Sequence, residues 1–150
     1  MILLQFIYSF FATFGFCLIF HVPFRHIVPA SLIGAFGWAA YQYLLWLDVS
    51  AVLACFMGAC VVGVLSEIFC RLFKEASLIF IIPGILPLVP GAGMYNTMLS
   101  LMTEDMLVTS KIATETLLMA GGIAMAILLV SSISRMITYI VVPSDTGDHQ

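Results

Sequence analysis

Residues 83 to 93 read PGILPLVPGAG, and they lie inside an apolar run, residues 77 to 102, that is long enough to cross a lipid bilayer. Three prolines and three glycines fall within this short stretch. A proline has no backbone N–H, and its ring clashes with the carbonyl group four residues earlier, so each proline interrupts the hydrogen bonds of a helix. The pattern therefore predicts a membrane-crossing helix that is broken over residues 83–93.

The composition of the whole chain is that of an integral membrane protein. Of its 150 residues, 63% are hydrophobic and only 9% are charged, and the mean hydropathy is +1.16. A soluble domain of this size needs more charged residues to cover its surface. The net charge is −3 and there is no basic cluster, which argues against nucleic acid as a partner.

The apolar runs predict an all-α integral membrane protein with about five transmembrane helices, the fourth of which is broken. In the first run, Gln5, Ser9 and Thr13 recur at every fourth position and so share one face, which we expect to look into a helix bundle. The third run has small residues at i, i+4 spacing, which favour close helix packing. The predicted spans cover about 2–20, 27–47, 51–70, 77–102 and 112–140, and a polar tail follows at 143–150.

The basic residues give these five spans an orientation. Arg25, Arg71, Lys74 and Arg135 fall on one side of the membrane, whereas Lys111 falls on the other. Basic residues collect on the cytoplasmic side of a membrane protein. We therefore expect an external N-terminus, a cytoplasmic C-terminus and a location in the bacterial plasma (inner) membrane.

The broken fourth span is the first candidate for a functional site. Transporters often build their substrate site near the middle of the membrane from broken helices, because unpaired backbone groups are tolerated there only in a cavity or inside protein. A second half-helix that begins near Gly91 would direct free N–H groups at an anion such as a carboxylate. The alternative is a kinked helix whose prolines serve packing alone. The predicted substrate pathway consists of Pro83, Gly84, Pro87, Pro90, Gly91, Gly93, Tyr95 and Asn96.

Two acidic residues are candidates for coupling transport to an ion gradient. Glu67 precedes Arg71 by four residues, so it could form an interfacial ion pair with Arg71 or act as a proton-coupling carboxylate. Glu115 lies beside Lys111 at the start of the last span and is the weaker candidate. An ion gradient is the expected driving force, because the chain has no nucleotide-binding motif.

The remaining polar residues do not suggest an enzyme. The chain has no nucleophile–base pair and no metal-ligand cluster, and its four cysteines lie in apolar runs without metal-type spacing. The three histidines fall in predicted loops or in the tail. We therefore expect no catalytic residues, no metal and no cofactor.

The number of spans indicates one half of a transporter. A complete secondary transporter commonly has two repeats around a site near the middle of the membrane, and five spans are few for that. An odd number of spans lets a second five-span half sit in the opposite orientation. We therefore expect this chain to be completed by another subunit or by a second copy of itself.

Several motifs together are similar to those of a known family: VPFR at 22–25, GAFG at 34–37, Ile82-Pro83, PLVPG at 87–91 and Tyr95. They resemble the threonine/serine exporter family, and more closely the small subunit of its split, two-component form. The resemblance covers nearly the whole chain, and its most specific part is the proline-rich segment.

This resemblance implies a plasma-membrane exporter and a larger partner with a cytosolic N-terminal region and five spans of its own. Members of the family are associated with export of threonine and serine, and split enterobacterial members with export of succinate. All three substrates carry a carboxylate, and the choice between amino acid and dicarboxylate stays open. The resemblance predicts a membrane subunit of a secondary exporter. The alternative is an assembly subunit that stabilises a partner holding the substrate site.

Overall fold

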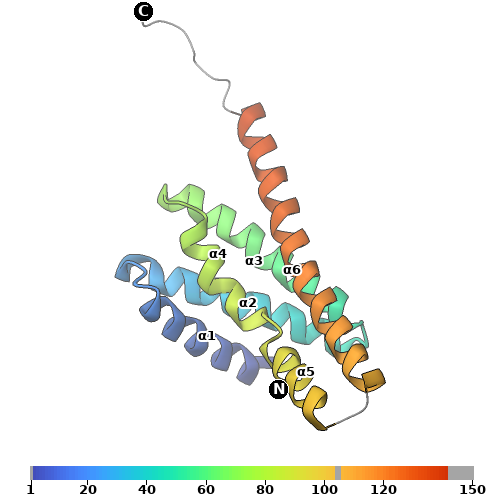
Figure 1. Cartoon of the computed structure of the whole chain (residues 1–150). Coiled ribbons are helices and arrows are strands. Elements are labelled where there is room, and N and C mark those ends of the chain that lie inside the picture. Colours follow the sequence, from blue (N-terminus) through green and yellow to red (C-terminus); the bar gives the residue numbers. More distant parts are fainter. Residues whose placement is uncertain (1, 104–105, 142–150) are drawn as a thin grey trace, which may run out of the picture.

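The computed structural model describes residues 2–103 and 106–141, with side chains from residue 3 to residue 137. Every regular element in this part of the chain is a helix, which confirms the predicted all-α class (Figure 1). The tail predicted at 143–150 lies outside the described residues. The elements are α1 (Ile2–Ile19), α2 (Phe24–Trp46), α3 (Ala51–Phe73), α4 (Leu78–Ile85), the 3-10 helix η1 (Leu86–Leu88), α5 (Gly91–Thr103) and α6 (Met106–Val141).

Helices α1 and α2 pack side by side through the polar face predicted for the first helix. The indole N–H of Trp38 donates to Gln5 Oε1 at 3.0 Å. Ser9 Oγ donates to the backbone carbonyl of Gly34 at 3.3 Å, and Thr13 Oγ1 donates to Ser9 O at 2.8 Å. The prediction that these polar groups look into the bundle is therefore confirmed: Gln5 and Ser9 join α1 to α2, and Thr13 bonds within α1.

Small residues let α2, α3 and η1 approach closely. Gly58 of α3 is buried, and a Cβ atom there would lie 3.0 Å from both Gly37 O and Leu88 Cδ2. Farther along α3, a Cβ on Gly63 would lie 3.2 Å from Val130 of α6. The close approaches predicted from the small residues of α3 are confirmed, and α3 uses them on two different neighbours.

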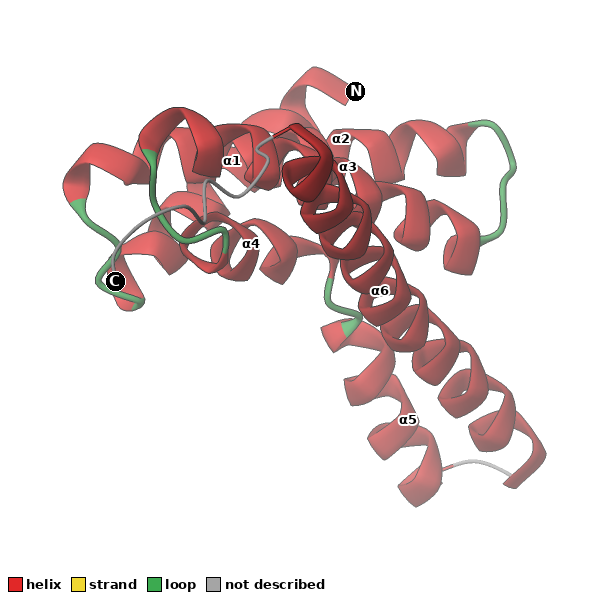
Figure 2. Ribbon diagram, turned by 90° about the horizontal axis from the view of Figure 1, so that it is seen from above, coloured by secondary structure: helices red, strands yellow, loops and turns green. Residues whose placement is uncertain are grey.

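Helix α5 packs against α6 and, within the described residues, against no other helix. Figure 2 shows α5 and the first half of α6 lying side by side, directed away from the body that α1 to α4 form. The second half of α6 returns along α3. One side of α5 is therefore covered by α6, and the rest of its surface is exposed.

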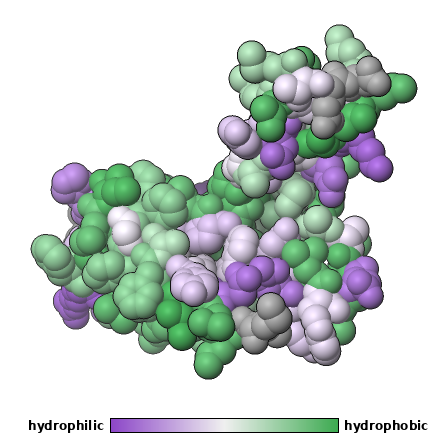
Figure 3. All heavy atoms as spheres, turned by 90° about the horizontal axis from the view of Figure 1, so that it is seen from below, coloured by the Kyte–Doolittle hydropathy of each residue, from purple (hydrophilic) through white to green (hydrophobic). Residues whose placement is uncertain are grey.

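The surface suits a lipid environment. Large apolar side chains are exposed on every α-helix, and Figure 3 shows a face covered mostly by apolar side chains, with polar ones gathered in separate patches. Two helical segments, Ala51–Phe73 and Met106–Ile137, are long and apolar enough to cross a membrane on their own. The pair Leu78–Leu88 and Gly91–Thr103, bent by 45°, would be a third span. Each of the five predicted spans coincides largely with helix, and the count of five stays a prediction.

The break in the fourth span is shorter than predicted. Helix α4 continues through Pro83 and Gly84 to Ile85, so the expectation that Pro83 ends the helix is wrong. The fixed φ of proline is compatible with a helix, and a single proline removes only one hydrogen bond. The chain leaves the α-helix at η1, Val89 is extended with φ −60° and ψ 128°, and α5 begins at Gly91.

Candidate functional site

The first predicted site residues, Pro83 and Gly84, lie in the protein core. Both are buried in α4. A Cβ on Gly84 would lie 3.1 Å from Val62 of α3 and 3.2 Å from Ile33 of α2. In this chain the two residues are packing residues that bring α4 against α2 and α3, which favours the packing interpretation at this point of the segment.

Pro87 and Pro90 lie on either side of the extended residue. Pro87 is half-buried and borders a hollow of about 250 Å³ beside Gln5 and Trp38. Pro90 is buried, and its carbonyl oxygen accepts a hydrogen bond from the N–H of Met94 at 3.1 Å. These two prolines therefore lie where the chain turns from the α1–α4 body into α5.

The start of α5 opens onto the surface. Gly91 is exposed, and a Cβ atom there would meet nothing within 4 Å. Gly93 faces α6, where a Cβ would lie 2.5 Å from Thr116 Oγ1. Tyr95 is 67% exposed, and Asn96 is exposed as well. The N-terminus of α5 and the side chains of Tyr95 and Asn96 thus lie on a surface that no other described part of the chain covers.

A second polar site lies where α3, α4 and α6 meet. Glu67 Oε1 accepts a hydrogen bond from Ser77 Oγ at 3.1 Å, and Glu67 Oε2 accepts one from Ser134 Oγ at 2.6 Å. Arg71 Nη2 donates to Ser134 Oγ at 2.9 Å and to Ser134 O at 3.0 Å. The predicted contact between Glu67 and Arg71 is therefore indirect, because the hydroxyl of Ser134 on α6 lies between them. The Glu67 carboxylate connects α3 with α6 and with Ser77, the residue before α4.

Two hollows flank this carboxylate. The larger, about 440 Å³, has both polar and apolar walls: its lining residues are Glu67, Ser77, Leu78, Ile81, Ile127, Ser131, Ser134 and Arg135. The smaller, about 270 Å³, is mostly apolar and includes Glu67, Ser134 and Arg71 in its wall. Glu67 and Ser134 therefore lie in the walls of both hollows.

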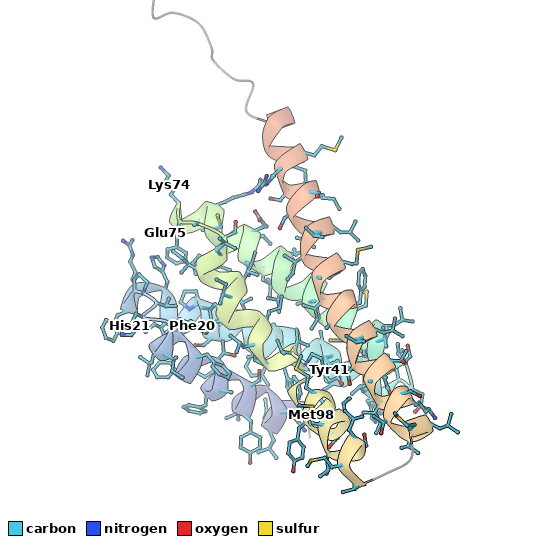
Figure 4. All side chains as sticks on the ribbon, in the orientation of Figure 1. Phe20, His21, Tyr41, Lys74, Glu75 and Met98 are labelled. Carbon is cyan, nitrogen blue, oxygen red and sulfur yellow. The ribbon has the colours of Figure 1, made fainter. Side chains whose placement is uncertain are left out.

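A buried histidine lies near the same end of the molecule. His26 is 3% exposed and packs edge-on against Phe73 and Phe80. Its Nε2 lies 3.6 Å from a carboxylate oxygen of Glu75. Figure 4 shows Lys74 and Glu75 at the turn between α3 and α4, and Met98 on α5 at the opposite end. The prediction that His26 lies in a loop is wrong, because α2 begins at Phe24.

Glu115, the other predicted coupling residue, is far from this site. It is exposed on α6, nineteen residues before Ser134, which corresponds to about 28 Å along the helix. Among the described residues, no group of three or more His, Cys, Asp or Glu side chains could hold a metal ion. The two acidic candidates are therefore in separate places, and only Glu67 belongs to a polar network.

The prediction from sequence missed Ser77, Ser131, Ser134 and Arg135. Three of them carry a signal that could have been found, because residues 131, 134 and 135 have i, i+3, i+4 spacing and so share one face of a helix. Ser77 has no such local signal, because it reaches Glu67 only through the turn between α3 and α4.

Residues 5–133 match the family described as Threonine/Serine exporter, ThrE. The chain belongs to the threonine/serine exporter family. Members of this family are transporters, so the chain is a membrane protein of an exporter-type family and not of an enzyme family.

One curated relative of this chain is an uncharacterized protein of Haemophilus influenzae, 29% identical over 87 residues. The match covers 58% of this chain and 29% of the relative, which is therefore about twice as long. No solved structure matches the chain.

Proposed function

We propose that the chain is a membrane subunit of a secondary exporter of small carboxylate-bearing metabolites, and that it acts with a second five-span subunit. The substrates are threonine and serine or a dicarboxylate such as succinate. The observation that carries the proposal is the family match over residues 5–133; a bent helix pair, a feature from which transporters often build their substrate sites, supports it.

The exposed surface of α5 supports the need for a second subunit. Gly91, Tyr95 and Asn96 are exposed, and α5 is covered by α6 alone within the described residues. A substrate site near the middle of a membrane must be shielded from lipid by protein, because irregular backbone is tolerated there only inside protein or along a water-filled cavity. A larger five-span partner, or a second copy of this chain, would supply the missing wall, and the greater length of the Haemophilus influenzae relative is compatible with two halves in one polypeptide.

The proposed driving force is an ion gradient, with Glu67 as the coupling group. The Glu67 carboxylate accepts hydrogen bonds from Ser77 and Ser134, and Arg71 donates to the same Ser134 hydroxyl, so these bonds link α3 with α6 and with the residue before α4. Gain or loss of a proton there would change the contact between α3, α4 and α6. The proposed location is the bacterial inner membrane, with the N-terminus outside.

The alternative is an assembly subunit whose partner holds the substrate site. The burial of Pro83 and Gly84 favours this alternative, because it gives part of the broken segment a purely structural role. Counterflow of labelled threonine, serine and succinate into proteoliposomes separates the two functions. Transport is expected with both subunits and is expected to be lost when Gly91, Tyr95 or Glu67 of this chain is altered. Full transport by such variants would favour the assembly role.

A further inference from the structure

We propose that the larger hollow between α3, α4 and α6 binds an anionic phospholipid, with the phosphodiester at Arg135 and an acyl chain along the apolar wall. The inference goes beyond the proposed function, because it concerns the lipid around the protein and not the exported molecule. The hollow, with about 440 Å³, falls within the range of about 300–1,000 Å³ that is usual for small-molecule sites.

The wall that α6 contributes changes from charged to apolar along the helix. Arg135, Ser131 and Ile127 line the hollow, and their spacing of four residues places them on one side of α6. From Arg135 back to Ile127 the helix rises about 12 Å. A phospholipid presents its groups in the same order, because its phosphate is followed by polar ester groups and then by acyl chains.

The wall on the α4 side has the same order. Ser77 precedes α4, and Leu78 and Ile81 follow in its first turn. Ser77 and Ser134 donate to the two oxygens of the Glu67 carboxylate, at 3.1 and 2.6 Å, so the polar ends of both walls lie at the same level. Leu78 is 62% exposed. An acyl chain on this wall would therefore remain continuous with the surrounding bilayer.

The charged groups around the hollow leave one positive charge without a partner of opposite sign. Glu67 and Arg71 bond to the same hydroxyl of Ser134, so their opposite charges lie close together and offset each other. Arg135 is exposed and lines the hollow, and no hydrogen bond or ion pair joins it to another described residue. Its guanidinium presents paired N–H donors that match phosphate oxygens. A phosphodiester, with its single negative charge, would balance the charge of Arg135.

The apolar part of the hollow favours a lipid over a water-soluble phosphate. A soluble phosphate would leave the wall of Leu78, Ile81 and Ile127 without an apolar partner. Lys74 and Arg135 are predicted on the cytoplasmic side of the membrane. The lipid leaflet on that side is anionic, and basic pockets between transmembrane helices there bind anionic headgroups. The expected ligand is therefore an anionic lipid of the cytoplasmic leaflet.

The test is native mass spectrometry of the purified full chain, released from micelles of a non-ionic detergent after lipid has been added. One molecule of phosphatidylglycerol should stay bound at concentrations at which phosphatidylcholine does not, because the choline group cancels the charge of its own phosphate. Glycerophosphoglycerol, the same headgroup without acyl chains, should not displace the lipid. Equal retention of the two lipids, or displacement by glycerophosphoglycerol, would overturn the inference.

Matched substitutions assign the lipid to the hollow. Arg135→Gln should weaken phosphatidylglycerol binding about tenfold, because it removes a charge-assisted contact, and Arg135→Lys should retain part of the affinity. Arg25→Gln makes the same charge change at an exposed position that does not line the hollow, and it should bind as the unaltered chain does. Unchanged binding by Arg135→Gln, or an equal loss in Arg25→Gln, would refute the assignment.

A second variant keeps the assignment testable if Arg135→Gln does not fold, which thermal unfolding of each variant would show. Ser131→Ala removes a hydroxyl from the proposed phosphate end and should weaken phosphatidylglycerol binding about threefold. Unchanged binding by this variant would then refute the assignment. Because binding is measured on the chain alone and without transport, the lipid site and the exporter function can each fail while the other stands.

Discussion

Replacing Gly93 with alanine tests whether α5 is held against α6 by one close approach. A Cβ at this position would lie 2.5 Å from Thr116 Oγ1 and 3.1 Å from Thr116 Cγ2. Threonine has a second rotamer available in a helix, but turning to it would break the hydrogen bond from Thr116 Oγ1 to Ile112 O, which measures 2.8 Å. Either the two helices separate or Thr116 loses this bond.

The expected net effect is a loss of about 1–2 kcal/mol in the free energy of unfolding. Overpacking of this kind costs about 1–3 kcal/mol, and replacing a helical glycine with alanine returns about 0.5–1 kcal/mol. Gly91→Ala is the matched control, because a Cβ at Gly91 meets nothing within 4 Å. That variant should be as stable as the unaltered chain or slightly more stable.

The assay is reversible unfolding of the purified chain in mixed micelles, measured for Gly93→Ala, Thr116→Ala and the double variant. Thr116→Ala removes the two atoms nearest the new methyl group, so the double variant should be more stable than the sum of the single effects predicts, by at least about 1 kcal/mol. Purely additive effects, or a Gly93→Ala chain as stable as Gly91→Ala, would refute the close approach of α5 and α6.

Three further perturbations address the sites and the topology. Ser134→Ala removes the hydroxyl that joins Arg71 to Glu67 and should lower the free energy of unfolding by about 1–3 kcal/mol, whereas alanine at the exposed Ser132 should be neutral in the same unfolding assay. Gly91→Leu should abolish export, and it should leave membrane insertion intact because leucine favours insertion by roughly 0.5 kcal/mol. Unchanged export in proteoliposomes would show that the start of α5 is not part of the substrate pathway. Labelling of single introduced cysteines in intact cells should find the N-terminus outside and the α3–α4 turn inside, and an N-terminus on the same side as that turn would contradict the five-span arrangement.

The sequence predicted the helices well, because their signals are local. Apolar length predicts helix in a membrane, and the spacing of Gln5, Ser9 and Thr13 correctly predicted a face that packs on α2. The small residues of α3 correctly predicted close approaches, although spacing alone did not say that Gly58 and Gly63 would meet different helices. These features depend on neighbours within one or two helical turns.

The parts that the sequence did not predict depend on contacts between distant segments. Pro83 was expected to end a helix, but the packing of α4 against α2 and α3 stabilises helical structure through it. Glu67 was paired with Arg71 on the basis of spacing, and the hydroxyl that joins them comes from residue 134, which no local pattern connects to α3. A polar site formed by residues of three helices can be predicted only when the packing of those helices is known.

The length of α6 has a consequence for the depth of that polar site. Its 36 residues rise about 54 Å, far more than the roughly 30 Å of hydrocarbon in a bilayer. Within it, residues 116–134 contain no Asp, Glu, Lys or Arg, and this stretch rises about 28 Å, close to the thickness of the hydrocarbon. Glu115 and Arg135 would then lie at opposite edges of the hydrocarbon layer. The hollow beside Arg135 would then lie at the edge of the hydrocarbon layer, close to one membrane surface.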